Sequence, residues 1–439
     1  MWQGACPASG TRRPRCDLDR GVGDGEGSAG GHELDSRDGP VTARAAQTAS
    51  IVIIGGGLEG VATAWALAQR GITDVVVCER DTVGGGMTGK SSGIVRCHYG
   101  VSSLAAMAAT GLEVFEKAEE IFGTDIGFRQ TGYVVGVGAP NVENLRKSLA
   151  AQREVGVQTE EIDRSEVAKL WPAADLDPFA AFGWEERGGY GDAYQTAQAF
   201  AASARAGGTR IRQSTSVAGL LIGGEKVVGV RLTDGSTISA DTVVVATGVW
   251  TRPFLAAHGI DVPIDVHREQ IVMIHPGVEL GAVPVFSDLV SLQYVRPDVR
   301  GEILFGNSDL AELEVADPDG YLNRADEAFL ELTVDKVGTR FPAFTDAAIT
   351  SSYAGCYDVT PDWNPIISAG PLDGLVIAAG FSGHGFKISP AVGRLVADIV
   401  VEGHSTDPRV PESDFRLSRF AEDDLLRTRF PYVGAGEMR

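Results

Sequence analysis

The chain has 439 residues, of which 44% are hydrophobic, and a formal net charge of −21. This length predicts two domains, or one domain with a sizeable insertion, and the charge argues against nucleic-acid binding and against docking on anionic membranes. No apolar run reaches the length of a membrane span, and five cysteines without metal-site or paired spacing indicate a reduced, cytoplasmic chain without a structural metal.

The N-terminal residues 1–48 differ from the rest of the chain. They are rich in glycine, arginine, aspartate and serine and poor in apolar residues, which predicts a disordered tail. They lack the apolar stretch of a signal peptide and carry more acids than a transit peptide does. Whether residues 1–40 are translated is left open, with a start near Val41 as the alternative.

A dinucleotide-binding βαβ pattern follows the tail. The sequence predicts a strand over 50–54, a helix over 61–70 and a second strand over 74–78. The glycines of the fingerprint, which allow a tight turn and close approach of a pyrophosphate, are Gly55, Gly57 and Gly60. Glu79 ends the second strand, where an acid accepts from ribose hydroxyls and favours FAD or NAD over NADP.

The middle of the chain supplies further helices and strands. Residues 84–93 form a small-residue loop too long for an ordinary connection, and such loops tend to be functional. Residues 211–245 predict a β-meander with turns at 223–224 and 234–235, and its last strand leads to Gly248. Other helices are predicted at 103–122, 141–154, 191–206 and 325–341, and other strands at 128–137, 270–274, 291–295, 303–305 and 375–379.

Residues 380–387, with the sequence GFSGHGFK, combine glycines with one lysine before another predicted helix, 391–400. Ser389 suits the N-cap of that helix and Pro390 its first position. Free N–H groups at a helix start favour a negative charge. The segment therefore predicts an anion-binding mouth.

Five motifs in this order resemble the D-amino-acid-oxidase-type (DAO) family of FAD-dependent oxidoreductases, with the sarcosine oxidase and dimethylglycine dehydrogenase branch the nearest in appearance. They are the fingerprint at 55–60, TGKSSGIVRCHYG at 88–100, VVVATG at 243–248, YAGCYDVTPDWNPII at 353–367 and AAGFSGHGFK at 378–387. The likeness covers roughly residues 50 to 405. It implies an α/β, two-domain fold, in which a Rossmann-like FAD-binding domain carries an inserted, mainly antiparallel β-sheet substrate domain.

The resemblance also implies domain boundaries. A discontinuous FAD-binding domain is expected from 49–126, 190–260 and 350–410, and a substrate domain from 127–189 and 261–349. Residues 411–439 are expected to form a C-terminal extension.

The residues expected to bind FAD follow from the same resemblance. They are Gly55, Gly57, Gly60, Glu79, Arg80, Ser91, Ser92, Gly93, Val217, Gly248, Gly380, Gly383, Gly385, Phe386 and Lys387. Monomeric sarcosine oxidases attach FAD to a cysteine at the position of Gly355, and Cys356 is one residue away. A one-residue slip in a strand turns a side chain to the other face, so FAD is expected to be non-covalent and Cys356 a buried thiol. A link through Cys356 is left open.

Four residues are expected to be catalytic by resemblance. Arg96 and Lys387 match the pair that grips the substrate carboxylate, with a phosphate contact or salt bridge and a solvated surface lysine as the respective alternatives. Tyr357 matches an active-site tyrosine, or is a core aromatic. His384 contacts the flavin edge or bonds only to backbone.

Arg268 falls on an "RxQ" strand of the family, where it either lines the site or has a structural role. The branch uses a lysine over the flavin for oxygen, yet no lysine lies between Arg268 and Lys336. The electron acceptor is therefore open between O2 and an unknown protein or quinone.

The implied reaction is oxidation of a secondary or tertiary amine that bears a carboxylate, such as sarcosine, dimethylglycine or another N-methyl amino acid. Hydride passes to flavin N5 and the resulting imine hydrolyses. One alternative is a D-amino acid, glycine or proline oxidase or dehydrogenase, and another is the flavoprotein subunit of a multi-subunit amine dehydrogenase. An NAD-linked dehydrogenase would account for the fingerprint but would leave the 380–387 mouth unexplained. Homo- or hetero-oligomerisation stays open.

Overall fold

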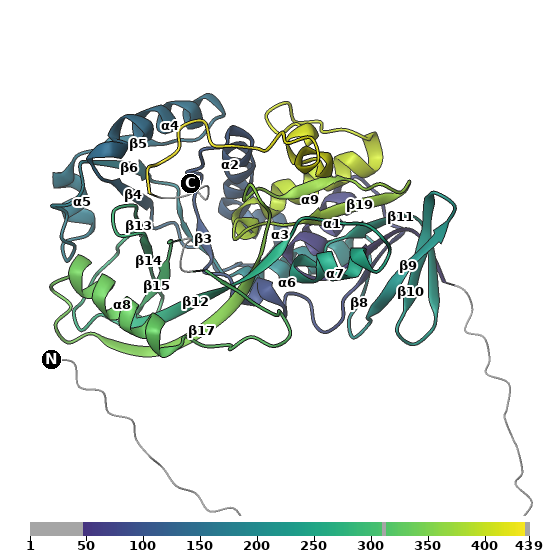
Figure 1. Cartoon of the computed structure of the whole chain (residues 1–439), viewed down its shortest axis with the longest axis horizontal. Helices are drawn as coiled ribbons and strands as arrows, with labels where there is room; N and C mark the ends of the chain where they lie inside the picture. Colours follow the sequence, from purple (N-terminus) through teal and green to yellow (C-terminus); the bar gives the residue numbers. More distant parts are fainter. Residues whose placement is uncertain (1–46, 310–312, 435–439) are drawn as a thin grey trace, which may run out of the picture. The chain divides into compact units, whose positions relative to one another are not determined.

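Two β-sheets organise the part of the chain that the structure describes, residues 47–309 and 313–434 of a computed structural model (Figure 1). One sheet has eight strands and the other nine. Most of the predicted tail lies outside the described residues, and its last two residues, Gln47 and Thr48, already belong to the first strand. Among the described residues, no helix is long and apolar enough to cross a membrane.

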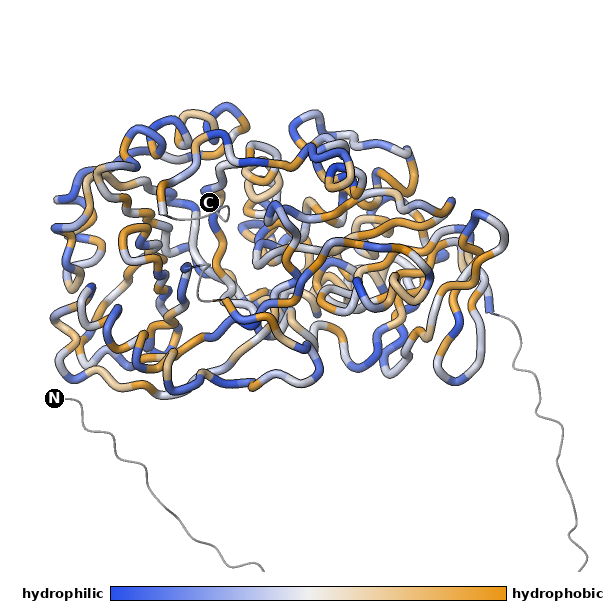
Figure 2. The backbone as a smooth tube through the Cα atoms, viewed as in Figure 1, coloured by the Kyte–Doolittle hydropathy of each residue, from blue (hydrophilic) through white to orange (hydrophobic). Residues whose placement is uncertain are grey.

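The eight-stranded sheet contains the βαβ unit predicted from the sequence. Strand β1 (Gln47–Ile54) pairs in parallel with β2 (Val75–Cys78) on one side and β11 (Thr237–Val245) on the other, and α1 (Leu58–Gln69) connects β1 to β2. The other strands of this sheet are β8 (Arg210–Arg212), β9 (Val217–Gly223), β10 (Lys226–Leu232), β18 (Ile366–Ala369) and β19 (Leu375–Ala379). The central strands are buried, which explains their continuous apolar runs (Figure 2).

Helices α1, α2 (Ser102–Glu116), α6 (Ala193–Ala206) and α9 (Gly385–Glu402) share one hydrophobic core with this sheet. Small residues let α1 and α9 approach closely: a Cβ on Gly393 would lie 2.3 Å from the carbonyl oxygen of Ala62. Tight packing of these two helices fixes where their N-terminal ends lie.

The nine-stranded sheet is mainly antiparallel, and only β4 (Tyr133–Val137) and β13 (Val285–Asp288) pair in parallel. Its longest pair joins β12 (Asp265–His275) to β17 (Ala348–Val359). The remaining strands are β5 (Glu160–Ile162), β6 (Ala181–Glu185), β14 (Gln293–Pro297), β15 (Ile303–Asn307) and β16 (Glu314–Val315). The predicted α/β fold with a second, mainly antiparallel sheet is confirmed, whereas the domain boundaries stay a prediction.

The remaining elements include a two-stranded sheet of β3 (Ile94–Val95) and β7 (Gly189–Tyr190), which pair antiparallel, and several short helices. The others are η1 (Met87–Lys90), α3 (Ala118–Phe122), η2 (Ala139–Asn141), α4 (Val142–Glu154), α5 (Arg164–Leu170), η3 (Gly248–Trp250), α7 (Thr251–Ala256), α8 (Glu327–Arg340), η5 (Glu412–Phe415) and η6 (Leu417–Phe420). The last two lie in the C-terminal segment, where Arg419 makes a fully buried ion pair with Asp362 at 2.8 Å.

The structure corrects the predicted start of the last helix. α9 begins at Gly385 after His384, so Ser389 and Pro390 lie inside it. Pro390 has no N–H for the carbonyl of Phe386, and the Ser389 hydroxyl donates to that carbonyl instead, at 2.9 Å. The proline is therefore accommodated within the helix, and Lys387 lies in its first turn.

Three other predicted elements differ from the structure. The helix over 103–122 is divided at Lys117 into α2 and α3. The strand over 128–137 is shorter, β4, because Gly132 takes a φ of +86° before it. The meander starts at Val217, since β8 pairs in parallel with β2 instead.

We expect Gly393→Ala to destabilise the protein by about 1–3 kcal/mol, because the added methyl group meets the backbone of α1. Gly338→Ala is the matched control, since Gly338 is also helical but has nothing within 4 Å of its Cβ position. That substitution is expected to stabilise by up to about 1 kcal/mol. Urea unfolding measures both, and equal effects of the two substitutions would contradict the close packing of α1 on α9.

Candidate cofactor and substrate site

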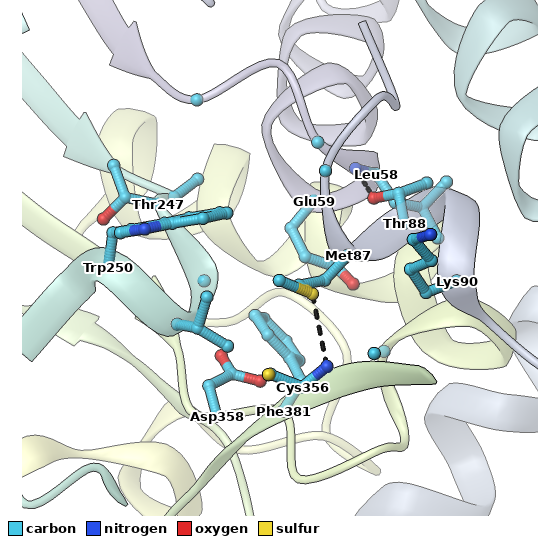
Figure 3. Close-up of a pocket in the computed structure, with 18 of the residues that line it drawn as sticks. Leu58, Glu59, Met87, Thr88, Lys90, Thr247, Trp250, Cys356, Asp358 and Phe381 are labelled. Carbon is cyan, nitrogen blue, oxygen red and sulfur yellow. Dashed lines mark hydrogen bonds between the residues drawn. The ribbon is translucent and has the colours of Figure 1, made fainter. Parts of the chain in front are cut away.

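A cavity of about 340 Å³ lies where the carboxyl end of β1 meets the second sheet (Figure 3). Its wall includes the N-terminal residues of α1 and α9 and residues of β12 and β17. Nucleotides bind at the carboxyl ends of parallel strands in open α/β sheets. The cavity therefore lies where the fingerprint predicts it.

The glycines of the fingerprint keep the first turn compact. Gly55 has a φ of +107°, and a Cβ there would lie 2.3 Å from the carbonyl oxygen of Ala246. Gly60 does not border the cavity but packs under the turn, with its Cβ position 2.0 Å from the oxygen of Gly55. The N–H of Leu58 donates to the Thr88 hydroxyl at 3.0 Å, so the 84–93 loop lies against the start of α1.

Glu79 borders the cavity, as predicted, and its carboxylate is held by backbone. Oε2 accepts from the N–H of Gly56 at 2.7 Å, and Oε1 accepts from the N–H of Asp81 at 2.8 Å. The guanidinium of Arg80 lies 4.3 Å from the ring centre of Trp250, and both residues line the cavity. Val217, Gly248, Ser91 and Ser92 border it as well, so this wall contains most of the residues expected to bind the nucleotide.

The glycine-rich mouth before α9 forms the opposite wall. A Cβ on Gly383 would lie 2.7 Å from the ring of Tyr357, and one on Gly385 would lie 2.5 Å from Oε1 of Glu59. Gly383, Gly385, Phe386 and Tyr357 all border the cavity. Gly380 and Gly93 do not, since each packs against protein instead.

Two acids that were not predicted lie between the starts of α1 and α9. Oε2 of Glu59 is buried and has no hydrogen-bond partner in the part of the chain that the structure describes, and burial, with the nearby Asp358, raises the pKa of Glu59 well above its usual range. Burial also raises the pKa of Asp358 to about 6, although that carboxylate accepts from the N–H of Gly380 at 2.7 Å. Glu59 stands inside the fingerprint between Leu58 and Gly60, which is the only local signal of its position.

Cys356 is buried, as expected, and pairs with Arg268 on the face of the sheet that is turned away from the cavity, although Cys356 is also among the residues that line the cavity. Its neighbour Gly355 also borders the cavity, so this edge of β17 exposes consecutive residues. Glu59 and Met87 extend toward Cys356 and Asp358 in Figure 3, and the N–H of Cys356 lies 3.2 Å from the sulfur of Met87. Burial raises the pKa of the Cys356 thiol to about 11.

Three of the four residues expected to be catalytic converge on Tyr99 and do not border the cavity. The guanidinium carbon of Arg96 lies 4.5 Å from the ring centre of Tyr99, and the Lys387 nitrogen lies 5.8 Å from it. Nδ1 of His384 lies 3.1 Å from the Tyr99 hydroxyl. Arg96 also donates to the carbonyl of His98. The structure brings the two cations to one aromatic ring that sequence reasoning missed.

Arg268 has the structural role that was one of its two expected alternatives. It faces away from the cavity and pairs with Asp326 at 2.9 Å and with Glu314 at 3.3 Å. Because successive residues of a strand point to opposite faces, its neighbour Glu269 borders the cavity. Glu269 was not predicted.

Next to Arg96, the buried carboxyl group of Glu185 accepts from the N–H of Cys97 at 2.7 Å. Burial raises its pKa to about 7, against the opposing effects of that hydrogen bond and of Arg96. Glu185 therefore holds its proton into the neutral range.

Comparison with known proteins agrees with this geometry. A family model described as "DAO: FAD dependent oxidoreductase" matches residues 50–399. The chain is 29% identical to sarcosine oxidase subunit beta of Arthrobacter sp, over 86% of this chain and 92% of that one. It is 28% identical to 4-methylaminobutanoate oxidase (formaldehyde-forming) of Paenarthrobacter nicotinovorans, over 84% of this chain but only 45% of that protein. Among solved structures, L-proline dehydrogenase from P. horikoshii matches with a TM-score of 0.79 and 29% identity, over 87% of this chain and all of that one.

We expect Glu185→Gln to change how stability depends on pH. Since the folded state keeps a proton on Glu185 up to a pKa of about 7 and an unfolded Glu releases it near 4.3, the free energy of unfolding falls as pH rises across this interval. The glutamine variant lacks this fall, so its stability relative to the wild type is expected to increase from pH 5 to pH 8 in urea unfolding.

Glu161→Gln, on the neighbouring strand β5, is the control. Its hydrogen bond with Arg146 lowers the pKa of Glu161, so the carboxylate is ionised throughout pH 5 to 8 and the difference from wild type stays constant. A constant difference for Glu185→Gln as well would contradict the assigned protonation.

Proposed function

Because the chain belongs to the DAO family of FAD-dependent oxidoreductases, we propose that it oxidises a secondary or tertiary amine that carries a carboxylate, as sarcosine and dimethylglycine do. FAD supplies the two-electron acceptor when bound, taking the hydride at flavin N5. Loss of the hydride leaves an imine, which water hydrolyses. The observation that carries this proposal is the pair of cations, Arg96 and Lys387, gathered on Tyr99 directly beside the mouth of α9.

The cavity suits FAD because two helix starts and seven glycines border it. The residues at the start of α1 and Glu79 would hold the adenosine diphosphate half, and Val217 would lie beside the adenine. Gly383, Gly385 and Phe386 would face the flavin, where the positive end of α9 favours the negative charge of the reduced ring. Arg80, Ser91, Ser92 and Gly248 also line the cavity, whereas Gly93, Gly380 and Lys387 of the predicted FAD set do not.

Arg96 and Lys387 bind the substrate carboxylate in this proposal. A guanidinium and an ammonium held against one buried ring are pre-organised, and binding a carboxylate between them fixes the C–H bond next to nitrogen relative to the flavin. Tyr357 borders the cavity itself, while His384 positions Tyr99 through its ring nitrogen. No residue has to act as a nucleophile.

Two relatives favour further candidates. The chain spans nearly the whole of a protein named as a subunit of sarcosine oxidase, which favours a flavoprotein subunit with partner chains. The likeness to an L-proline dehydrogenase favours a cyclic secondary amine as substrate and an acceptor other than O2. Anaerobic reduction of the purified protein by a panel of amino acids, followed by exposure to air, distinguishes these candidates.

We expect Arg96→Met and Lys387→Met each to lower kcat/KM for sarcosine or the best carboxylate substrate by about 10- to 100-fold, since a hydrogen bond to a charged group is worth about 1.5–3 kcal/mol. FAD content per chain is expected to stay unchanged. Stopped-flow reduction of the flavin gives the rates, and its absorbance gives the content.

Arg394→Met is the matched control for Lys387, because Arg394 is an exposed basic residue on the same helix. It is expected to leave both quantities unchanged. Loss of FAD in parallel with loss of activity would assign Arg96 and Lys387 to the cofactor and refute the carboxylate role.

We further propose that FAD is held without a covalent bond. The thiolate, not the thiol, is the reactive form of cysteine, and the pKa of Cys356 is about 11, so the group stays protonated near neutral pH. Denaturation in acid is expected to release all flavin into the supernatant, and Cys356→Ala is expected to retain it before denaturation. Flavin that stays with the wild-type precipitate, but not with the alanine variant, would show a covalent link.

A further inference from the structure

The face of the nine-stranded sheet that borders the cavity carries an acid opposite a glycine. Glu269 on β12 pairs with Gly355 on β17, and residues directly opposite in an antiparallel pair share a face. Both residues border the cavity. Because Gly355 has no side chain, the aliphatic part of Lys90 packs there, and a Cβ on Gly355 would lie 2.7 Å from Lys90 Cβ.

Glu269 is buried and incompletely satisfied. It is 6% exposed, and its Oε1 atom has no hydrogen-bond partner among the described residues. Burial raises its pKa to about 8, and no charged group contributes to this shift. An acid in this position costs stability unless a ligand satisfies it, so its presence needs a functional explanation.

Tyrosines surround this acid on the same face. Tyr294 on β14, Gly306 on β15, Ile271 on β12 and Tyr353 on β17 are in register across four strands. A Cβ on Gly306 would lie 2.2 Å from the Tyr294 hydroxyl, so the Tyr294 side chain lies across the glycine toward β12. Burial and then the nearby Tyr357 and Glu269 raise the pKa of Tyr294.

The titratable groups near Glu269 on this face are tyrosines of β14 and β17 and Lys90, which packs on Gly355. Lys90 and Glu59 border the same cavity from η1 and α1, and the Lys90 nitrogen is bonded to Asn323 at 2.9 Å. A buried carboxyl group among aromatic rings is the chemistry that recognises an alkylated ammonium, since the rings attract the cation and the carboxylate neutralises it.

We propose that Glu269 binds the alkylated ammonium group of the substrate and takes up its proton before oxidation. This inference rests on the proposed amine oxidation and specifies how the nitrogen is recognised. The Glu269 carboxylate accepts the N–H proton, which leaves a neutral carboxyl group and a neutral amine. The amine lone pair then forms the C=N bond as the adjacent C–H hydrogen departs with its electron pair to the acceptor already named. Glu269 returns the proton to solvent after the product leaves.

The first test measures binding alone, in the FAD-loaded protein. Betaine carries a quaternary nitrogen that can be neither deprotonated nor oxidised through its lone pair, and 3,3-dimethylbutanoate is its neutral carbon isostere. Above pH 8 the wild type is expected to bind betaine about tenfold or more tightly than the isostere, by the change in flavin absorbance, and Glu269→Gln is expected to remove this preference. Glu314→Gln, on β16 and paired with Arg268 on the opposite face, is expected to keep it.

The second test is the pH profile of kcat/KM with sarcosine or the best amine found. In the wild type a limb is expected near pH 8, where Glu269 ionises. In Glu269→Gln this limb is expected to disappear and the rate to follow the pKa of the amine itself, about 10. A merely structural role for Glu269 would lower the rate without moving the limb.

The outcomes separate this inference from the function on which it rests. If no amine reduces the wild-type flavin, the proposed function fails. If amines reduce it but Glu269→Gln, with full FAD content, keeps the betaine preference and the pH limb, only the role of Glu269 is overturned.

Discussion

The starts of α1 and α9 open on one cavity, and much of the surrounding structure keeps these two positive ends accessible. Gly393 brings the two helices together, and Gly55, Gly383 and Gly385 keep side chains away from the backbone at their ends. The helix ends favour an anionic ligand. Two acids, Glu59 and Asp358, lie beside this site for a negatively charged cofactor. They are tolerated there because burial raises the pKa of each, which favours the uncharged form.

The second sheet contributes to the site because the side chains of its strand β12 alternate between its two faces. On β12, Arg268 faces away from the cavity and is neutralised by Asp326 and Glu314, whereas Glu269 faces the cavity and its Oε1 atom has no hydrogen-bond partner among the residues that the structure describes. Since neighbouring residues of a strand point to opposite faces, the same few residues supply both an anchored structural cation and an unsatisfied acid. The second sheet thus brings an acid, Glu269, to the cavity from a part of the chain that is separate from the nucleotide-binding loop.

Local patterns predicted the nucleotide-binding half well, because strand, turn, helix and terminal acid follow one another within about 30 residues. The predicted start of α9 was wrong because Ser389 and Pro390 are typical of the first residues of a helix. Inside α9, the Ser389 hydroxyl instead donates to the Phe386 carbonyl, which Pro390 leaves without its backbone donor. Tyr99 and Glu269 were missed because their significance depends on partners far away in the chain. Cys356 follows the predicted alternation, because it pairs with Arg268 while Gly355 pairs with Glu269.

The order of strands has a consequence for how the protein is made. β19 pairs with β11, α9 follows it, and Arg419 is buried against Asp362, so the βαβ unit is completed by segments more than 300 residues beyond β1 in the chain. Domains fold as units once their chain is available, and pairing between distant segments is slow. The nascent chain therefore presents the βαβ unit without its covering wall until β19 and α9 have been synthesised, and the cavity can form only after these distant segments have paired.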